Sequence, residues 1–314
     1  MDDTFVYRKK YNIHKSLRRL VSVTPPKAGH RTKLANMKLA FQAPVQGSPD
    51  DLVDYFKEEF VTKTGEKRTI LRIRPKSAQG ATPGLVWFHG GGFLLKAAPH
   101  HYRLARQYAV ETGCQVLMVD YRLMPEYSHP SQIHDAFFAW NHITKNAEAL
   151  LLDPERIAIG GDGVGGSLAA GCCLKIRDEG WHRPCFQMLL YPILDFYTFG
   201  NSPKEYADSP VWNTEANKRM WAQYLYSGLV EGANYASPAL PKSFRGFPPT
   251  YVEVVLGSCV LSEGINFAGN LEHLGGKYHV VRNAVHGFDA VADSPITIDC
   301  VSRRIAKLKE AFAK

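Results

Sequence analysis

From about residue 67 onward, segments with the apolar pattern of strands alternate with segments of helical period. Turn residues bound the predicted strands, which cover residues 68–75, 84–90, 114–122, 156–161, 185–194, 250–257 and 277–283. Apolar residues at helical spacing predict helices over residues 101–113, 130–150, 262–275 and 297–312, and another directly after residue 163. This alternation predicts an α/β fold with a mostly parallel sheet covered by helices on both faces.

Two parts of the chain break this alternation. Residues 1–45 are predicted to be largely helical, and residues 195–240 form an insertion rich in large aromatic side chains. Such an insertion suits a lid over a pocket, although ordinary helix packing would use the same residues. We therefore expect N-terminal lid helices over 1–45 and a main domain over 46–314 with a lid insertion at about 195–240.

The composition is that of an ordinary globular protein, with 45% hydrophobic and 22% charged residues. The net charge is +8, but basic residues are dense only over residues 7–20, where we expect the solvated face of a packed helix. The sequence thus favours neither a nucleic-acid partner nor a membrane span, since it contains no apolar run of membrane-spanning length. Without a signal-peptide pattern at the N-terminus, a cytoplasmic location is expected.

The 6 cysteines are scattered, with no C-x-x-C pair and no zinc-finger spacing. We expect them to be reduced and mostly buried thiols. The sequence implies no metal and no organic cofactor.

Several short motifs occur in a fixed order along the chain. They are HGGGF (89–93), DYRLMPE (120–126), His129-Pro with Asp135 on the next helix, GDGVGG (161–166), a Tyr-Pro pair at Tyr191, and HGF (286–288). In this order and spacing the chain resembles the hormone-sensitive-lipase-like branch of the α/β-hydrolase fold. The resemblance covers roughly residues 67–314 and implies a carboxylesterase-like or lipase-like site.

In that family, backbone N–H groups of the glycine-rich loop and of the residue after the nucleophile form an oxyanion hole. The resemblance assigns these donors to Gly91, Gly92 and Val164. His89 and Asp162 are expected to support the two loops. Such fixed donors contribute about 2.7–4 kcal/mol to transition-state stabilisation in other enzymes.

The catalytic triad of the family is incomplete in this sequence. The turn that carries the nucleophilic serine as G-x-S-x-G has Gly163 at the serine position. The acid loop reads SCVLSEG, with Ser258 at the aspartate position, and only Glu263 and the following glycine match the family pattern. His286 remains at the position of the general base. Two of the three triad side chains are therefore missing.

Other side chains could in principle replace them. The nearby alternatives are expected to be packed in the core or badly aligned for attack: Ser167, Cys172, Cys173 and Cys259. Glu263 could reach His286 if its loop were rearranged.

Three functions stay open at this stage. The first is a carboxylic-ester hydrolase-like protein with at most weak, water-mediated hydrolysis through His286 and the oxyanion hole. The second is a protein that binds a small molecule in the lidded pocket. The third is a non-hydrolytic enzyme, such as a lyase, that uses His286 as acid and base. The expected ligand is a small apolar ester or a related molecule, and an edge strand or the last helix could pair two copies in a homodimer.

Overall fold

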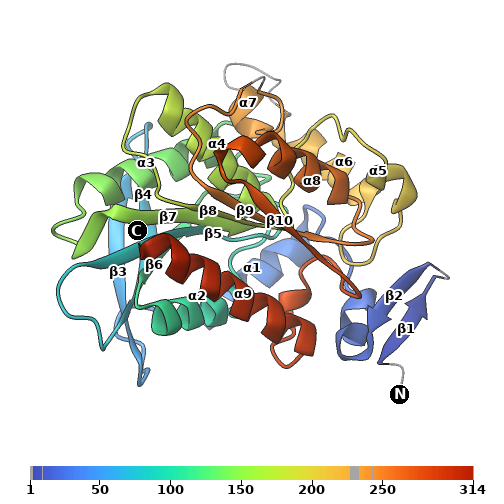
Figure 1. Ribbon diagram of the computed structural model, residues 1–314, viewed down its shortest axis with the longest axis horizontal. Helices are drawn as coiled ribbons and strands as arrows, with labels where there is room; N and C mark the ends of the chain where they lie inside the picture. Colours follow the sequence, from blue (N-terminus) through green and yellow to red (C-terminus); the bar gives the residue numbers. More distant parts are fainter. Residues whose placement is uncertain (1–2, 9, 227–232, 242, 314) are drawn as a thin grey trace.

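An eight-stranded sheet runs through the centre of the molecule and carries helices on both faces (Figure 1). The computed structural model describes residues 3–8, 10–226, 233–241 and 243–313. The strand order is β10-β9-β8-β7-β5-β6-β4-β3. The strands are β3 (Val53–Val61), β4 (Lys67–Pro75), β5 (Thr82–Phe88), β6 (Gln115–Asp120), β7 (Leu152–Asp162), β8 (Gln187–Leu190), β9 (Thr250–Val255) and β10 (Lys277–Val281).

The sheet is parallel from β10 through β6, whereas β4 and β3 are antiparallel to their neighbours. This confirms the prediction of a mostly parallel central sheet. Strand β3, which pairs with β4 along its whole length as the edge strand, was not predicted from the sequence. Because an edge strand is covered on fewer sides, its sequence, VDYFKEEFV, mixes charged with apolar residues and gives a weak signal.

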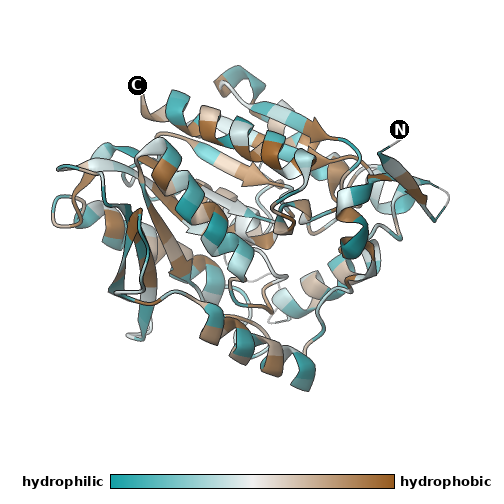
Figure 2. Ribbon diagram, turned by 90° about the horizontal axis from the view of Figure 1, so that it is seen from below, coloured by the Kyte–Doolittle hydropathy of each residue, from teal (hydrophilic) through white to brown (hydrophobic). Residues whose placement is uncertain are grey.

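Two helical layers enclose the sheet. On one face lie α2 (Pro99–Thr112) and α9 (Pro295–Phe312), and on the other lie α3 (Ser131–Lys145), α4 (Val164–Asp178) and α8 (Leu261–Asn270). Each layer has its own hydrophobic core against the sheet. Hydrophobic and hydrophilic residues are mixed along most of the helices, as expected when one side of a helix is buried (Figure 2). Helix α4 is an exception, since nearly all of its residues are buried.

The N-terminal part differs from the helical prediction. Strands β1 (Thr4–Tyr7) and β2 (Tyr11–His14) form an antiparallel ribbon, followed by the 3-10 helix η1 (Lys15–Ser22) and by α1 (His30–Gln42). Tyr11 and Ile13 are both buried with exposed Asn12 between them, which is the two-residue period of a strand. The helical interpretation of these two segments was therefore wrong, and among the described residues up to 45 only those of η1 and α1 are helical.

The predicted lid insertion contains the short helices α5 (Ser202–Glu205), α6 (Thr214–Tyr224) and α7 (Ala233–Ala236). Its residues 227–232 lie outside the described part of the chain, as do residues 1–2 and 9 of the predicted N-terminal lid. Two further 3-10 turns, η2 (Glu272–Leu274) and η3 (Phe288–Ala290), follow α8 and β10.

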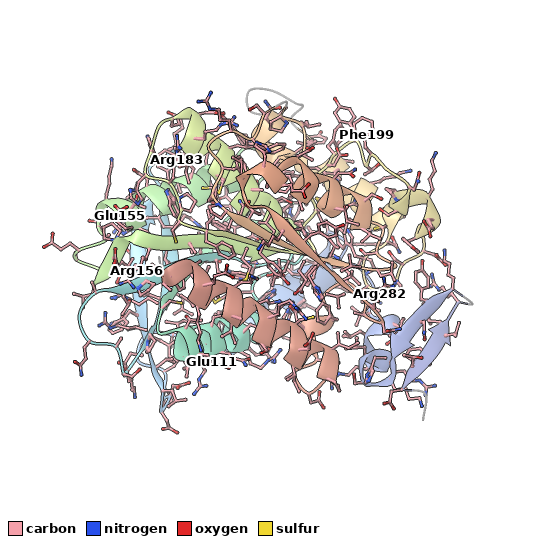
Figure 3. All side chains as sticks on the ribbon, viewed as in Figure 1. Glu111, Glu155, Arg156, Arg183, Phe199 and Arg282 are labelled. Atoms are coloured by element: carbon pink, nitrogen blue, oxygen red, sulfur yellow. The ribbon has the colours of Figure 1, made fainter. Side chains whose placement is uncertain are left out.

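Charged side chains are spread over the surface. Figure 3 labels several that point outward from different elements: Glu111, Glu155, Arg156, Arg183 and Arg282. Phe199 of the lid insertion also projects outward and is 64% exposed. No helix in the described part of the chain is both long and apolar enough to cross a membrane.

Candidate active site

A sharp turn joins strand β7 to helix α4 at the carboxyl edge of the sheet. β7 ends at Asp162, Gly163 has φ 53° and ψ −119°, and Val164 begins the helix. L-amino acids with a side chain rarely adopt this backbone conformation, whereas glycine adopts it freely. The strand, turn and helix predicted from GDGVGG are therefore all present.

His286 faces this turn from the loop that follows β10. A Cβ atom built on Gly163 would lie 3.5 Å from the His286 Nε2 atom and 4.0 Å from the Gly90 Cα atom. The imidazole packs between two aromatic rings, with centroids 4.8 Å from Tyr191 and 6.1 Å from Trp212. The structure thus brings together position 163, His286 and the glycine-rich loop.

In the described part of the chain, no acid forms a hydrogen bond with the other nitrogen of His286. Among the described residues, the buried Nδ1 atom has no hydrogen-bond partner. Ser258 is buried, and its Oγ accepts a hydrogen bond from the Val260 N–H at 3.4 Å. His286 is half-buried as a residue, and desolvation of its ring lowers the pKa to about 4, since it disfavours the charged form more than Asp162 and Asp289 favour it. The ring is therefore neutral at pH 7.

Glu263 does not take the place of the missing acid. Its Oε2 accepts a hydrogen bond from the Asp195 backbone N–H at 2.9 Å, and burial together with Asp195 raises its pKa.

The other candidate replacements for the missing triad residues also lie in contacts away from His286. The Ser167 hydroxyl donates to the Ile193 carbonyl, and the Cys259 thiol lies 3.6 Å from the Trp212 carbonyl oxygen. Cys172 and Cys173 are buried in the core, as expected.

The glycine-rich loop after β5 lies directly beside the turn. Gly91 and Gly92 both have positive φ, 114° and 66°, and the Gly91 carbonyl accepts hydrogen bonds from the N–H groups of Leu94 and Leu95. Val164 is the first residue of α4, where a backbone N–H has no partner within its own helix. The three predicted oxyanion donors therefore come from two adjoining loops.

Asp162 connects these two loops. Its Oδ2 accepts hydrogen bonds from the Gly90 N–H at 3.0 Å and from His101 Nε2 at 3.1 Å. The Ala98 N–H donates to His101 Nδ1 at 2.8 Å, so the neutral form of the ring carries its proton on Nε2, and the cationic form gives up this bond. Burial opposes ionisation of Asp162, but the charge and hydrogen bond of His101 outweigh it and lower the pKa to about 2. The pKa of His101 is raised, since Asp162 outweighs the burial of the imidazole.

His101 was missed from the sequence because nothing in its spacing links it to the turn. It lies 61 positions before Asp162 along the chain, and only the packing of α2 brings the two together. His89, in contrast, lies where it was expected to support its loop. Its Nδ1 donates to the Gly90 carbonyl at 2.7 Å, and its ring stacks on Tyr121 at 4.6 Å.

Trp212 of the lid insertion covers the glycine-rich loop. Its ring atoms lie 3.1 and 3.2 Å from a Cβ position on Gly92, and Pro26 lies 3.6 Å from the same point. Pro26 also lines a cavity of about 780 Å³ together with Leu95 and Asn213, the neighbour of Trp212. The Trp212 ring therefore contacts the glycine-rich loop and stacks on the imidazole of His286, while its neighbour Asn213 lines the cavity.

A family model with the description "alpha/beta hydrolase fold" matches residues 85–290, which include the glycine-rich loop, the turn and His286. The chain belongs to the α/β-hydrolase fold family. Within this family it is similar to the esterase LipI of Mycobacterium tuberculosis, with 30% identity over 74% of this chain and 73% of that protein. It is also 34% identical to the carboxylic ester hydrolase LipN of the same organism, over 68% of this chain and 58% of that protein.

Among solved structures, a bacterial heroin esterase is similar along almost the whole length. The TM-score is 0.86, with 29% identity over 96% of this chain and 98% of that one. These α/β-hydrolase relatives support the hormone-sensitive-lipase-like branch that the motifs indicated. In the described part of the chain, the one cluster of three side chains suited to a metal lies away from the turn, at β10 and α9.

Proposed function

We propose that this α/β hydrolase is an esterase-type protein with an impaired catalytic centre, capable of at most weak, water-mediated ester hydrolysis. The observation that carries the proposal is the position of His286. Its Nε2 faces the Cβ position of Gly163 at 3.5 Å, whereas its Nδ1 has no partner among the described residues. The base is in place, but the nucleophile and the acid are not.

The missing nucleophile decides which reaction is open. Gly163 has no side-chain oxygen, so no acyl-enzyme can form there. A water molecule in the space above Gly163 could instead transfer a proton to His286 Nε2 while it attacks an ester carbonyl. The N–H groups of Gly91, Gly92 and Val164 would stabilise the oxyanion that develops. In a protease from which triad members were removed, about 10³–10⁴-fold catalysis over water remained.

Without a carboxylate beside its Nδ1, His286 is only a weak base. Because burial lowers the pKa of His286 to about 4, the imidazole is neutral but weakly basic at pH 7. Hydrolysis through this residue should increase as pH rises through about 4 and then level off. A carboxylate beside Nδ1 would raise the pKa and hold the ring in the correct tautomer.

The test is restoration of the triad. Gly163→Ser/Ser258→Asp should hydrolyse short p-nitrophenyl esters at least about 10²-fold faster than the parent, because both missing groups return to a preformed frame. Gly163→Ala/Ser258→Asp is the matched control, since it adds the same Cβ without a hydroxyl and should gain nothing comparable. A folded double variant without any gain would overturn the proposal of an otherwise intact esterase centre. If the parent protein hydrolyses these esters no faster than His286→Ala, the proposed residual activity through His286 is wrong.

A second candidate is a binding protein for a small apolar ester or a related molecule. The cavity of about 780 Å³ beside Trp212 favours it, since that volume accommodates a ligand of drug size. In this case a ligand from an acyl-ester library should raise the unfolding temperature without being consumed. Disappearance of the ester during the measurement would favour the hydrolase instead.

A further inference from the structure

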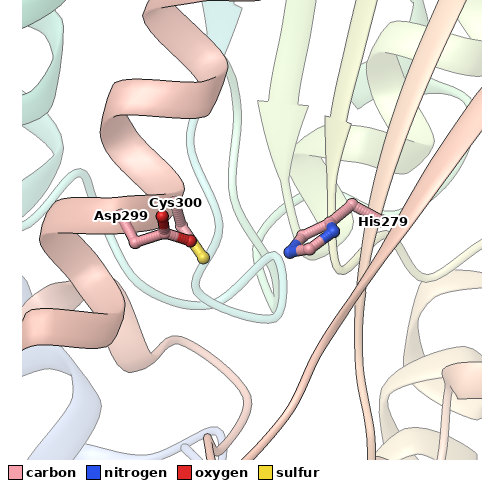
Figure 4. Close-up of side chains that lie close together, drawn as sticks. All are labelled: His279, Asp299 and Cys300. Atoms are coloured by element: carbon pink, nitrogen blue, oxygen red, sulfur yellow. The ribbon is translucent and has the colours of Figure 1, made fainter.

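A second cluster of reactive side chains lies between the last strand and the last helix. His279 comes from β10, and Asp299 and Cys300 come from α9 (Figure 4). Their nitrogen, oxygen and sulfur atoms all lie within 4.8 Å of one another. None of these residues belongs to the turn, the glycine-rich loop or the lid insertion.

The donor set has the chemistry of a zinc site. Imidazole, thiolate and carboxylate are the usual protein ligands of Zn²⁺, and sites with three such ligands keep a fourth position for water. The half-buried imidazole of His279 offers a ring nitrogen to this cluster. Tetrahedral bonds to zinc place nitrogen and sulfur ligands roughly 3.5 Å apart. The three ligand atoms lie within 4.8 Å of one another, so they must move closer together to bind one ion, and the exposed Asp299 side chain is free to do so.

The surrounding charges are compatible with a cation. Arg303 lies nearest, with Nη2 at 3.4 Å from Asp299 Oδ2, but both side chains are largely exposed and can separate. Arg304 is held by Glu253 at 2.5 Å and by Asp289 at 2.8 Å, so its charge is already balanced. Cys300 is buried, and a bound metal would coordinate its thiolate.

We infer that His279, Asp299 and Cys300 form a zinc site with water as the fourth ligand. The ion would join β10 to α9, the two elements on either side of the loop that carries His286. It would act as a cross-link between residues 279 and 300 and thereby stabilise the folded chain. The inference does not depend on ester hydrolysis.

Cobalt(II) serves as the spectroscopic probe, because a cysteine thiolate bound to Co²⁺ gives a charge-transfer band in the near ultraviolet. Titration of the metal-free full chain should give this band with one Co²⁺ per chain, and Zn²⁺ should displace it. Cys300→Ser should abolish the band. Cys185→Ser should retain it, since the half-buried Cys185 is a free thiol outside the cluster.

Zinc should also raise the unfolding temperature of the parent. His279→Gln should lose at least about tenfold in zinc affinity. His273→Gln is the matched control on the exposed surface and should bind zinc like the parent. Should Cys300→Ser fail to fold, Asp299→Asn at an exposed position gives the same comparison of affinities. Absence of a one-to-one complex, or a thiolate band that survives Cys300→Ser, would overturn the inference.

Discussion

At the scale of single residues, the backbone conformation at position 163 determines what it costs to place a side chain on the turn. A Cβ on Gly163 would make only ordinary van der Waals contacts, the nearest at 3.5 Å from His286 Nε2. The obstacle to a side chain is therefore the positive φ of 53° and not a collision. A nucleophile at this place must be held in a strained conformation, and glycine relieves that strain.

Gly163→Ser alone should therefore lower the free energy of unfolding by about 1–3 kcal/mol, the usual size of such backbone strain. Urea denaturation measures the change. Gly269→Ser is the control, because Gly269 lies in α8 with open space around its Cβ position and without positive φ. Equal stability of Gly163→Ser and the parent would mean that the turn relaxes when a side chain is added.

The buried pair of Asp162 and His101 makes a second prediction at this scale. The two side chains are 9% and 6% exposed, so His101→Leu leaves a buried carboxylate without its partner. We expect a loss of about 3–5 kcal/mol. Because the pKa of Asp162 is lowered in the folded chain, this group stabilises the fold at pH values above about 3.9, its pKa in the unfolded chain. Because the pKa of His101 is raised, this group stabilises the fold fully only at pH values below about 6.5, its pKa in the unfolded chain.

The cost of His101→Leu should therefore be larger at about pH 5.5 than at about pH 8.5, where the parent has itself lost part of the pair. Urea unfolding at the two pH values measures it. His273→Leu, on the surface, should show no such difference. A cost that increases from about pH 5.5 to about pH 8.5 would contradict the ion-pair interpretation.

At the scale of elements, the lid insertion is fastened to the glycine-rich loop by aromatic contacts. Tyr224 at the end of α6 stacks on Phe93 with a centroid distance of 4.3 Å, and its carbonyl accepts a hydrogen bond from the His129 N–H. Near the start of the helix, Trp212 covers Gly92 and donates through Nε1 to Asn217 at 3.2 Å. The lid insertion therefore contacts the glycine-rich loop at both ends of α6.

Removal of the Trp212 ring should open a path from the adjoining cavity to His286. We expect diethyl pyrocarbonate to modify His286 faster in Trp212→Ala than in the parent, measured by mass spectrometry of the peptide that contains it. Trp181→Ala is the control, because the Trp181 ring stacks on Phe137 away from the turn. An unchanged rate at His286 would show that Trp212 does not limit access.

At the scale of the whole molecule, one buried arginine connects parts that are distant in sequence. Arg304 of α9 binds Glu253 on β9 and Asp289 on η3, and Asp289 in turn accepts a hydrogen bond from Tyr191 at 2.7 Å. Tyr191 contacts the ring of His286. The last helix, the sheet and the candidate base therefore share one network.

Arg304→Met should destabilise the protein by about 3–5 kcal/mol, because two buried carboxylates lose their common partner. Arg303→Met next to it should change stability by less than about 0.5 kcal/mol, since its salt bridge is on the surface. Thermal and urea unfolding of the two variants test the difference. Similar effects of the two substitutions would argue against a structural role of the buried network.

The sequence by itself determined the order of strands and helices from residue 67 onward, since each element depends on a local period of apolar residues. It also determined that residue 163 has no nucleophile and residue 258 no carboxylate, because these are facts of residue identity. The glycine-rich loop and the turn were predictable for the same reason. Their glycines mark a close approach of the backbone, as at Gly165, or a backbone conformation that side chains rarely adopt, as at Gly163.

Only the tertiary structure decided which distant groups meet. Packing of α2 places His101 on Asp162, and packing of the lid insertion places Trp212 over Gly92. The orientation of α8 directs Glu263 to the Asp195 backbone, and His286 Nδ1 is left without a partner among the described residues. The ribbon at residues 4–14 likewise depends on contacts with distant residues, such as the bond from the His14 N–H to the Asn283 carbonyl. Such contacts arise from the packing of whole elements, for which a local pattern carries no signal.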